Sequence, residues 1–452
     1  MDPTIILQMI IAAILAAVLY TIIGIAPGTD ETAVLAPVTL VLVLAGFAPQ
    51  VVLAFFMSAI IAKKLTDSIP VAVAGIPGGV MSAPMVDHAM TLKKHGVPDL
   101  SIKKMASGSV IGTLVAVPIS ILFASAIIPI GDIIKDYASI LFFLGAVFLA
   151  LISKNRWLAL AVIIPFALLI QGLRHLYWGI GVIPEGQTVF ISFFLGITIG
   201  PIIYSLFQLM NRNFKEKLEP LGNKQINIRK SDPVKGFPNP FKILNKKEVG
   251  TTSVASFFGS LTFFMSPVGM TIFIGETLTS KIKDPIKRAS RAISSMDGLT
   301  NAAYISGVLI PLIAIGVPLS PMAIGPANAL FNAPPVFTVE NNIHHILSTP
   351  QIIVATIIGT VVALVITYYV TIKYSQQICA FVFRKIPHEA MLALFVGLVV
   401  MLAFMDAGLI NIFGVLLIGL VAGLLHRWGI NYGIQFMVLY AAPWIVTKII
   451  GM

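Results

Sequence analysis

Long apolar runs, separated by short polar stretches, follow one another along the whole chain. About a dozen of them, counting interrupted ones, are long enough to cross ~30 Å of hydrocarbon as helices. The runs lack the alternation of apolar and polar residues that is typical of a membrane β-barrel. The pattern predicts an all-α integral membrane protein with spans at 4–25, 33–62 (bent or divided near Pro49), 105–130, 137–152, 158–173, 189–210, 251–279, 352–371, 390–404, 409–425 and 432–449.

Two apolar segments contain too many prolines to form uninterrupted helices. Ile69–Met85 holds Pro70, Pro77, Pro84 and three glycines, and Ile310–Pro326 has a similar composition. Each interior proline removes a backbone donor and clashes with the preceding turn. Within hydrocarbon the freed groups need protein or water partners, so broken backbone usually lines a cavity. We therefore predict broken helices or re-entrant segments at both places.

The two broken segments match each other without a gap. Five residues recur 241 positions later in the chain, namely Ile69, Pro70, Gly75, Pro77 and Met81. The connection 86–104 after the first segment holds four lysines, whereas 319–371 holds neither Lys nor Arg. Because basic connections stay in the cytoplasm, the two connections are expected on opposite faces, with 332–350 outside. This arrangement predicts two inverted repeats with a transporter's binding site between the broken segments.

One long polar stretch, 211–250, separates the two halves. It contains ten basic and four acidic residues and four prolines, so it is too polar to cross the membrane and too interrupted for one helix. We interpret it as a basic cytoplasmic linker, with a regulatory lipid-binding segment as the alternative. The predicted organisation is a first membrane half at 1–210, the linker at 211–250 and a second membrane half at 251–452.

Composition supports a membrane protein and narrows its partners. Hydrophobic residues make up 57% of the 452 residues and charged residues only 11%, well below a soluble domain. Apart from those of the linker, the basic residues behind the net charge of +11 sit in short connections, where they orient the spans against the lipid bilayer rather than binding nucleic acid. A single cysteine, Cys379, excludes an intramolecular disulfide. The first run has no basic residue before it, so we expect a retained helix and not a signal peptide.

Several short motifs, in order along most of the chain, are similar to those of one family. They are Gly24-Ile25-Ala26-Pro27-Gly28 (a Pro-Gly-Leu-Gly break), Asp67-Ser68 with Gly75-Ile76-Pro77-Gly78 (Gly-Gly-Ser and Asn-Ile-Pro-Gly), Asp87 to Gly96 (Asp-Gly-Tyr-Pro-Met-Ala-Lys-Lys-Gly), Asn301-Ala302-Ala303, Pro311-Leu312, Gly316 to Leu319 and Gly423 to Gly429. The sequence thus resembles the large permease subunit of the tripartite tricarboxylate transporters. It departs from the family at Gly75 (Asn), at Leu319 (Gly), and at the acidic pair Asp30-Glu31, where the family is neutral.

This resemblance implies an importer of small carboxylates in the cytoplasmic (inner) membrane. It also implies two partners, a small membrane subunit and an extracytoplasmic solute-binding protein. A divergent branch that works alone is the alternative.

The broken helices also indicate where a small organic anion would bind. The N-terminus of a half-helix presents free N–H groups and a partial positive charge, which suits a carboxylate. Side-chain donors near the breaks would add to these amides. The expected substrate-binding residues are Pro27, Gly28, Thr29, Ser68, Gly75, Pro77, Gly78, Gly79, Ser82, Asn301, Gly316, Pro318 and Ser320. The alternative is that these prolines merely kink packed helices.

Ionisable residues within or beside apolar runs are costly to bury and therefore mark functional candidates. Asp30, Asp67 and Asp297 are the expected ion-coupling residues, and Glu31 and Asp406 also qualify. Each has a structural alternative: Asp30 in a first helical turn, Asp67 paired with neighbouring lysines, and Asp297 or Asp406 at a membrane surface.

No motif of an enzyme is present, and the adjacent His344 and His345 point in different directions, which disfavours a metal site. Ser107-Gly108-Ser109 is typical of close helix packing. We predict a secondary active transporter that needs no cofactor and is coupled to Na⁺ or H⁺. A passive channel and an intramembrane enzyme are the alternatives.

Overall fold

In the computed structural model, most of the chain is helical. The structure describes residues 2–26, 29, 31–74, 80–153, 155–185, 189–209, 236–264, 267–385, 388–430 and 432–450. Over these residues the β structure is limited to two isolated bridges, between residues 333 and 337 and between residues 338 and 341. The predicted all-α architecture is confirmed.

Elements of the first half run from α1 to α10. Their bounds are α1 Pro3–Ile25, α2 Glu31–Leu44, α3 Pro49–Thr66, α4 Ser68–Ala74, η1 Val80–Met85, α5 Val86–Lys94, α6 Pro98–Ile127, η2 Ile128–Ile130, α7 Gly131–Asp136, α8 Ala138–Ile152, α9 Arg156–Gly179 and α10 Phe190–Leu209.

Elements of the second half run from α12 to η5. Their bounds are α12 Pro240–Ile243, α13 Lys246–Leu261, α14 Pro267–Thr279, α15 Pro285–Ala314, α16 Pro321–Ile324, η4 Asn328–Leu330, α17 Ile343–Ile346, α18 Thr349–Lys385, α19 His388–Arg427, α20 Tyr432–Trp444 and η5 Ile445–Ile450.

Six helices of the described chain are long and apolar enough to cross a membrane: 3–25, 99–130, 156–179, 285–314, 349–374 and 396–427. Shorter apolar helices at 31–44, 138–151 and 192–204 accompany them. These helices fit a multi-pass protein, and the total of about a dozen spans stays a prediction.

Glycine and proline divide the helices where the sequence indicates a division. The predicted division of 33–62 is confirmed, because α2 ends at Leu44, Gly46 has a φ of +78° and Pro49 begins α3. In the single element α19, the backbone leaves the helical region at Ala407 and Gly408, which separates the two predicted spans there. A positive φ is adopted readily only by glycine.

Two polar stretches differ from the sequence-based interpretation. The sequence predicts a connection at 86–104, but this stretch forms α5 and the start of α6. The polar residues 63–68, which lie between the predicted span 33–62 and the first broken segment, are likewise largely helical. Lys63 and Lys64 are fully buried in the last turn of α3. From sequence alone, charged residues near a helix end are expected to be exposed, because the sequence does not show which neighbouring helices cover them.

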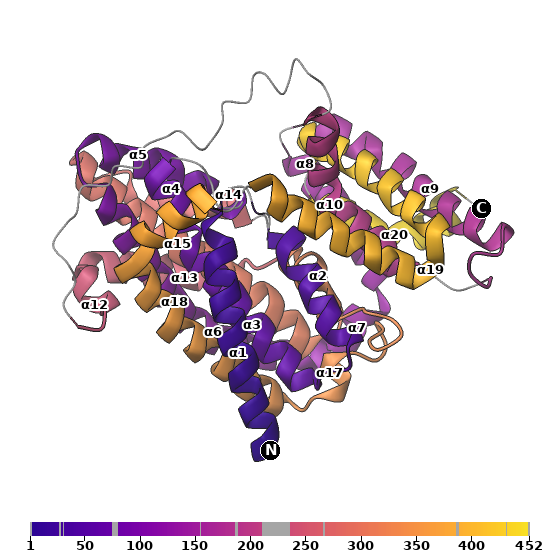
Figure 1. Cartoon of the computed structure of the whole chain (residues 1–452), viewed down its shortest axis with the longest axis horizontal. Helices are drawn as coiled ribbons and strands as arrows, with labels where there is room; N and C mark the ends of the chain where they lie inside the picture. Colours follow the sequence, from indigo (N-terminus) through magenta and orange to yellow (C-terminus); the bar gives the residue numbers. More distant parts are fainter. Residues whose placement is uncertain are drawn as a thin grey trace.

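The helices form two groups (Figure 1). A core bundle consists of α1, α3, α4, α5, α6, α13, α14, α15 and α18, and an outer bundle consists of α8, α9, α10, α19 and α20. The helix α2 contacts both groups, and the amide of Asn328 donates a 2.6 Å hydrogen bond to the hydroxyl of Tyr440 on α20. Each bundle contains helices from both halves of the sequence, so the spatial division does not follow the order of the chain.

The helix α15 is the centre of the core bundle, and every residue from Ala292 to Ala314 is buried. It packs on α6, where a Cβ on Gly108 or Gly112 would lie only 2.2–2.3 Å from the carbonyl oxygen of Ser294 or Gly298. These helices cross at backbone contact, which confirms the predicted role of the small residues. At the start of α15, Asp284 caps the helix and accepts hydrogen bonds from the backbone N–H groups of Lys287 and Ile286. These bonds, that of Lys287 most strongly, hold the pKa of Asp284 below its usual range.

Two predicted connections lie at opposite ends of α6, a helix ~45 Å long. At one end, Lys104 donates to Glu248, at the end of the basic linker, over 2.5 Å. At the other end, a Cβ on Gly131 would lie 2.3 Å from the carbonyl oxygen of Ala314, and the nearby carbonyl of Gly316 accepts a 2.8 Å bond from Asn342.

Candidate functional site

Two buried lysines and two acids form the centre of the polar interior. Lys63 and Lys64 lie in the last turn of α3, and α1 approaches them so closely that a Cβ on Gly24 would lie 2.9 Å from the carbonyl oxygen of Lys63. Asp67 directly follows α3, and Glu31 lies in the first turn of α2. All four charged side chains are at most 5% exposed.

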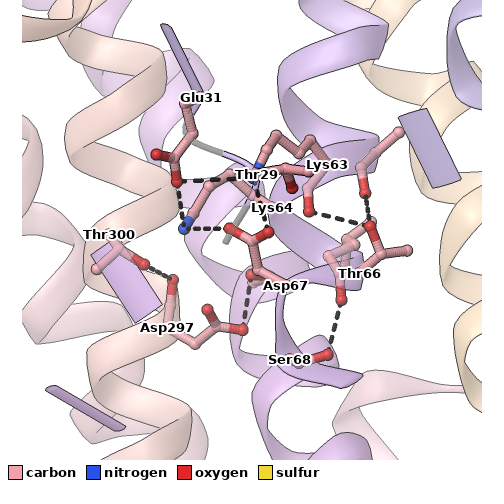
Figure 2. A network of polar contacts seen from close by, with 12 residues as sticks. Thr29, Glu31, Lys63, Lys64, Thr66, Asp67, Ser68, Asp297 and Thr300 are labelled. Atoms are coloured by element: carbon pink, nitrogen blue, oxygen red, sulfur yellow. Dashed lines mark hydrogen bonds and ion pairs between the residues drawn. The ribbon is translucent and has the colours of Figure 1, made fainter. Parts of the chain in front are cut away.

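Asp67 binds both ammonium groups more closely than Glu31 does. Its two carboxylate oxygens lie 2.8 Å from Nζ of Lys63 and 3.3 Å from Nζ of Lys64 (Figure 2). One oxygen of Glu31 lies 3.9 and 3.8 Å from the same two nitrogens. The spacing of Lys63 and Lys64 to Asp67, four and three residues, places them on one side of the helix. The expected structural alternative for Asp67, pairing with these lysines, is therefore present.

A second polar group lies on α15 beside the charged cluster. Asp297 is fully buried and extends toward the segment that carries Asp67 and Ser68 (Figure 2). Its Oδ2 accepts a 3.0 Å hydrogen bond from Ser109 on α6. One turn later, the amide nitrogen of Asn301 donates to the carbonyl of the same Ser109 over 2.9 Å and to the hydroxyl of Thr113 over 2.6 Å. Asp297 thus lies inside the bundle and not at a surface.

The second broken segment is present as a helix break between α15 and α16. The helix ends at Ala314, Gly316 has a φ of +76°, and the chain resumes with the four-residue helix α16. Ser320 donates to the carbonyl of Gly307 and accepts a 3.0 Å bond from the N–H of Ala323, so its side chain caps α16. Pro311, by contrast, lies within α15 without ending it.

The first broken segment lies partly outside the described residues. Its predicted site residues Gly75, Pro77, Gly78 and Gly79 are among the residues that are not described. The same holds for Pro27, Gly28 and Asp30 before α2. Of the others, Thr29 donates to the carbonyl of Ala26 over 2.9 Å and Ser68 to that of Leu65 over 2.8 Å. Ser82 is buried in η1.

The structure brings Thr29, Ser68, Asp67 and Asp297 into one region (Figure 2), while Asp406 lies elsewhere. Asp406 is an exposed residue at the kink of α19 in the outer bundle and accepts a hydrogen bond from Ser192.

Sequence reasoning missed Lys63, Lys64 and Ser109 as parts of the site. A signal was available for the lysines. They stand four and three residues before Asp67, between two apolar runs, and this spacing lets them form ion pairs with Asp67 that can be buried. For Ser109 no such signal exists, since its partners Asp297 and Asn301 lie on α15, far away along the chain.

Chemically, this interior holds opposite charges in contact at the place where helices break. Charged groups are expensive to bury in a membrane protein and mark ion or substrate pathways. Over the described residues, no group of three or more His, Cys, Asp or Glu side chains suits a metal ion. The architecture and the interior together define a multi-pass helical membrane protein with a charged, enclosed polar site.

Comparison with known families identifies the chain further. The model of the tripartite tricarboxylate transporter TctA family matches residues 10–435, so the chain belongs to this family. The expected family resemblance is confirmed, and the chain is a transporter component of this kind of system, in a family of transporters and not of enzymes. No curated protein matches the chain significantly. No solved structure matches it either.

Proposed function

We propose that the chain is the permease of a secondary active system that imports a small organic anion, a carboxylate, with Na⁺ or H⁺. The observation that carries this proposal is the buried pair Lys63 and Lys64. Two adjacent cations inside a membrane bundle attract an anion strongly, because the surrounding dielectric is low.

A substrate carboxylate would take the place of Glu31. The Glu31 oxygen lies 3.9 and 3.8 Å from the two lysine nitrogens, whereas the oxygens of Asp67 lie 2.8 and 3.3 Å from them. Asp67 would hold the lysines in position while the longer ion pair exchanges. The predicted site residues beside the two breaks, from Gly28 to Ser82 and from Gly316 to Ser320, would complete the binding site.

The inverted repeat belongs to the same proposal. When the matching broken segments are aligned, Ala74, the last described residue of α4, corresponds to Ile315, directly after the last residue of α15. The packing also corresponds, because α3 and α15 each pack on one helix of their own half and one of the other half. The helix α3 packs on α1 and α18, and α15 packs on α13 and α6. We propose the repeat halves 1–210 and 251–452, with 211–250 as the linker.

The two bundles provide a moving part and a scaffold. The core bundle holds the charged interior, and the outer bundle exposes large apolar side chains such as Phe413 and Leu409 to the lipid or to a membrane subunit. Transport would move the core bundle against the outer bundle, with α2 between them. The proposed partners are a small membrane subunit and an extracytoplasmic binding protein, in the cytoplasmic membrane.

Thermal unfolding of the purified protein with citrate, succinate or acetate tests the anion site. We expect citrate or succinate to raise the melting temperature of the wild type and of Lys373→Met, but not of Lys64→Met. Lys373 is a suitable control because it lies on α18, where its ammonium group contacts the ring and hydroxyl of Tyr369 one turn earlier. An equal response in Lys64→Met would contradict the site. Uptake that an ionophore does not abolish would favour a channel.

A further inference from the structure

Two neighbouring side chains on α15 each keep one buried oxygen atom that has no hydrogen-bond partner among the described residues. These atoms are Oδ1 of Asp297 and Oδ1 of Asn301, and both side chains are fully buried. A buried polar atom without a partner costs about 1–3 kcal/mol, and more if it is charged. Such a pair within a well-packed helix crossing therefore calls for a ligand.

The orientation of the Asn301 amide is fixed by its partners. The carbonyl oxygen of Ser109 can only accept, and the hydroxyl of Thr113 already donates to that carbonyl over 2.9 Å. Both neighbours therefore require the NH₂ group of Asn301, which leaves Oδ1 on the other side. This oxygen is an acceptor and would suit a cation or a donor, but not an anion.

Both side chains are held by the same residue of α6. Ser109 donates its hydroxyl to Oδ2 of Asp297 and accepts the Asn301 amide at its carbonyl. Residues four apart on a helix are neighbours, with Cβ atoms ~5–6 Å apart. The two Oδ1 atoms therefore belong to adjacent side chains that are oriented before any ligand arrives.

The balance of charges in the interior also favours a bound cation. Among the described residues of this interior, Lys63 and Lys64 are balanced by Glu31 and Asp67, and Asp297 adds one further acid. An unbalanced carboxylate in a membrane interior needs a proton or a bound cation. Hard cations prefer oxygen ligands of the kind that Asp297 and Asn301 present.

We propose that Asp297 and Asn301 bind a dehydrated Na⁺ ion through their Oδ1 atoms, with Ser109 and Thr113 as positioning residues. The inference rests on the proposed function only in regarding this ion as the coupling ion. The remaining ligands would be backbone or hydroxyl oxygens, which commonly coordinate Na⁺ at broken helices.

Na⁺-dependent thermal unfolding of the purified wild type tests this site without any substrate. At constant ionic strength, replacing choline chloride by NaCl should raise the melting temperature saturably, whereas KCl should not. Asp297→Asn and Asn301→Leu should need at least tenfold more Na⁺ for half of the shift. Asp406→Asn, which removes an exposed carboxylate of the outer bundle, should respond like the wild type.

Several results would overturn the ion site. They are a wild type that does not distinguish Na⁺ from choline, an unchanged response in Asp297→Asn, or a lost response in Asp406→Asn. If the variants fail to fold, saturable binding of ²²Na⁺ to the wild type decides, and its absence overturns the site. A citrate response without a Na⁺ response would overturn this inference and leave the proposed function standing. A Na⁺ response without a citrate response would support the ion site and contradict the proposed anion site.

Discussion

At the scale of single residues, the lysine pair shows how a membrane interior tolerates charge. Lys63 and Lys64 are buried because Asp67 and Glu31 are buried with them. Such a group is no strong source of stability as a whole, since desolvation offsets the attraction between the charges. Removing one member is a different matter, because an uncompensated charge then stays behind.

We expect Lys63→Met to lower the free energy of unfolding by about 3–5 kcal/mol, since it leaves an acid without its partner. The double variant Lys63→Met with Glu31→Gln restores the charge balance and should recover part of that loss. Denaturant or thermal unfolding in detergent measures both variants. Lys287→Met is the control: this lysine is 78% exposed and 3.8 Å from Asp284, so its loss should change stability by about 0–1 kcal/mol. Equal losses in Lys63→Met and Lys287→Met would contradict the burial of the pair.

The individual residues also show what sequence reasoning can recover. Asp67, Asp297 and Asn301 are predictable as site residues because a polar side chain within an apolar run is costly. Their partners are not predictable, because the contact of Asp297 with Ser109 is a property of two helices and not of either sequence segment.

At the scale of the elements, the crossing of α6 and α15 positions the polar interior. Glycines allow backbone contact at Gly108 and Gly112, and the same crossing presents Ser109 to α15. Hydrogen bonds of 2.6–3.0 Å then join the two helices. Close approach and side-chain orientation thus have one cause.

We expect Gly112→Ala to destabilise the protein and to impair transport, because its Cβ would lie 2.3 Å from the carbonyl oxygen of Gly298. The helices would have to separate, and overpacking of this kind typically costs about 1–3 kcal/mol. Gly172→Ala on α9 is the matched control, since no described atom lies within 4 Å of the position that its methyl group would take. It should stabilise by up to about 1 kcal/mol through helix propensity. A neutral Gly112→Ala, by unfolding and uptake assays, would contradict the backbone contact.

The helix breaks allow a comparison between prolines at a break and a proline inside a continuous helix. Replacing Pro318 by Ala restores a backbone donor and lowers the cost of continuing the helix by about 3 kcal/mol. The protein should then fold at least as well but transport less, because a break that we propose as part of the binding site closes. Pro77→Ala should behave alike if the two breaks are related by the repeat.

Pro311→Ala is the control for this pair, because Pro311 lies inside α15 without ending it. We expect a stability equal to or above that of the wild type, with transport retained. Melting temperature and uptake are measured for the three variants. A silent Pro318→Ala beside an inactive Pro77→Ala would contradict a symmetric site.

Elements are predictable where the signal is local. Gly46 and Pro49 divide one apolar run, and α15 ends just before Gly316 and Pro318, because backbone conformation at these positions depends on the residue itself. The helical stretch 86–104 has the sequence of a connection, since four lysines suggest solvent. The helical conformation of this stretch depends on packing against other helices, as the buried ion pair of Lys104 with Glu248 illustrates.

At the scale of the whole molecule, the arrangement of helices predicts an orientation in the membrane. The connection before α6 and the end of the linker meet at Lys104 and Glu248, and the loop with Asn342 lies at the other end of α6. The basic end is expected in the cytoplasm.

Two exposed positions test this orientation in a Cys379→Ser background. An impermeant thiol reagent should label Glu340→Cys from outside intact cells, and it should label Lys247→Cys only after the cells are opened. Total thiol content after denaturation controls for expression. Labelling of Lys247→Cys in intact cells would contradict the orientation.

The division into two bundles cannot be read from the sequence. Periodicity and composition indicate helices and halves, but they do not show that α1, α3 and α18 pack together. Contacts between distant helices depend on side-chain shapes at both surfaces, and a single sequence shows only one surface at a time.

The interlacing of the two halves also matters while the protein is being made. The lysines of α3 lie in a bundle that α18 closes, yet α3 ends at Thr66 and α18 begins only at Thr349. At a synthesis rate of about 5–20 residues per second, the ribosome needs tens of seconds to supply this helix. Throughout that interval Lys63 and Lys64 have Asp67 and Glu31 in the same part of the chain but lack α18, which later packs on their helix. The nascent chain therefore needs a protected place during insertion, and slowing elongation between α3 and α18 should increase its degradation.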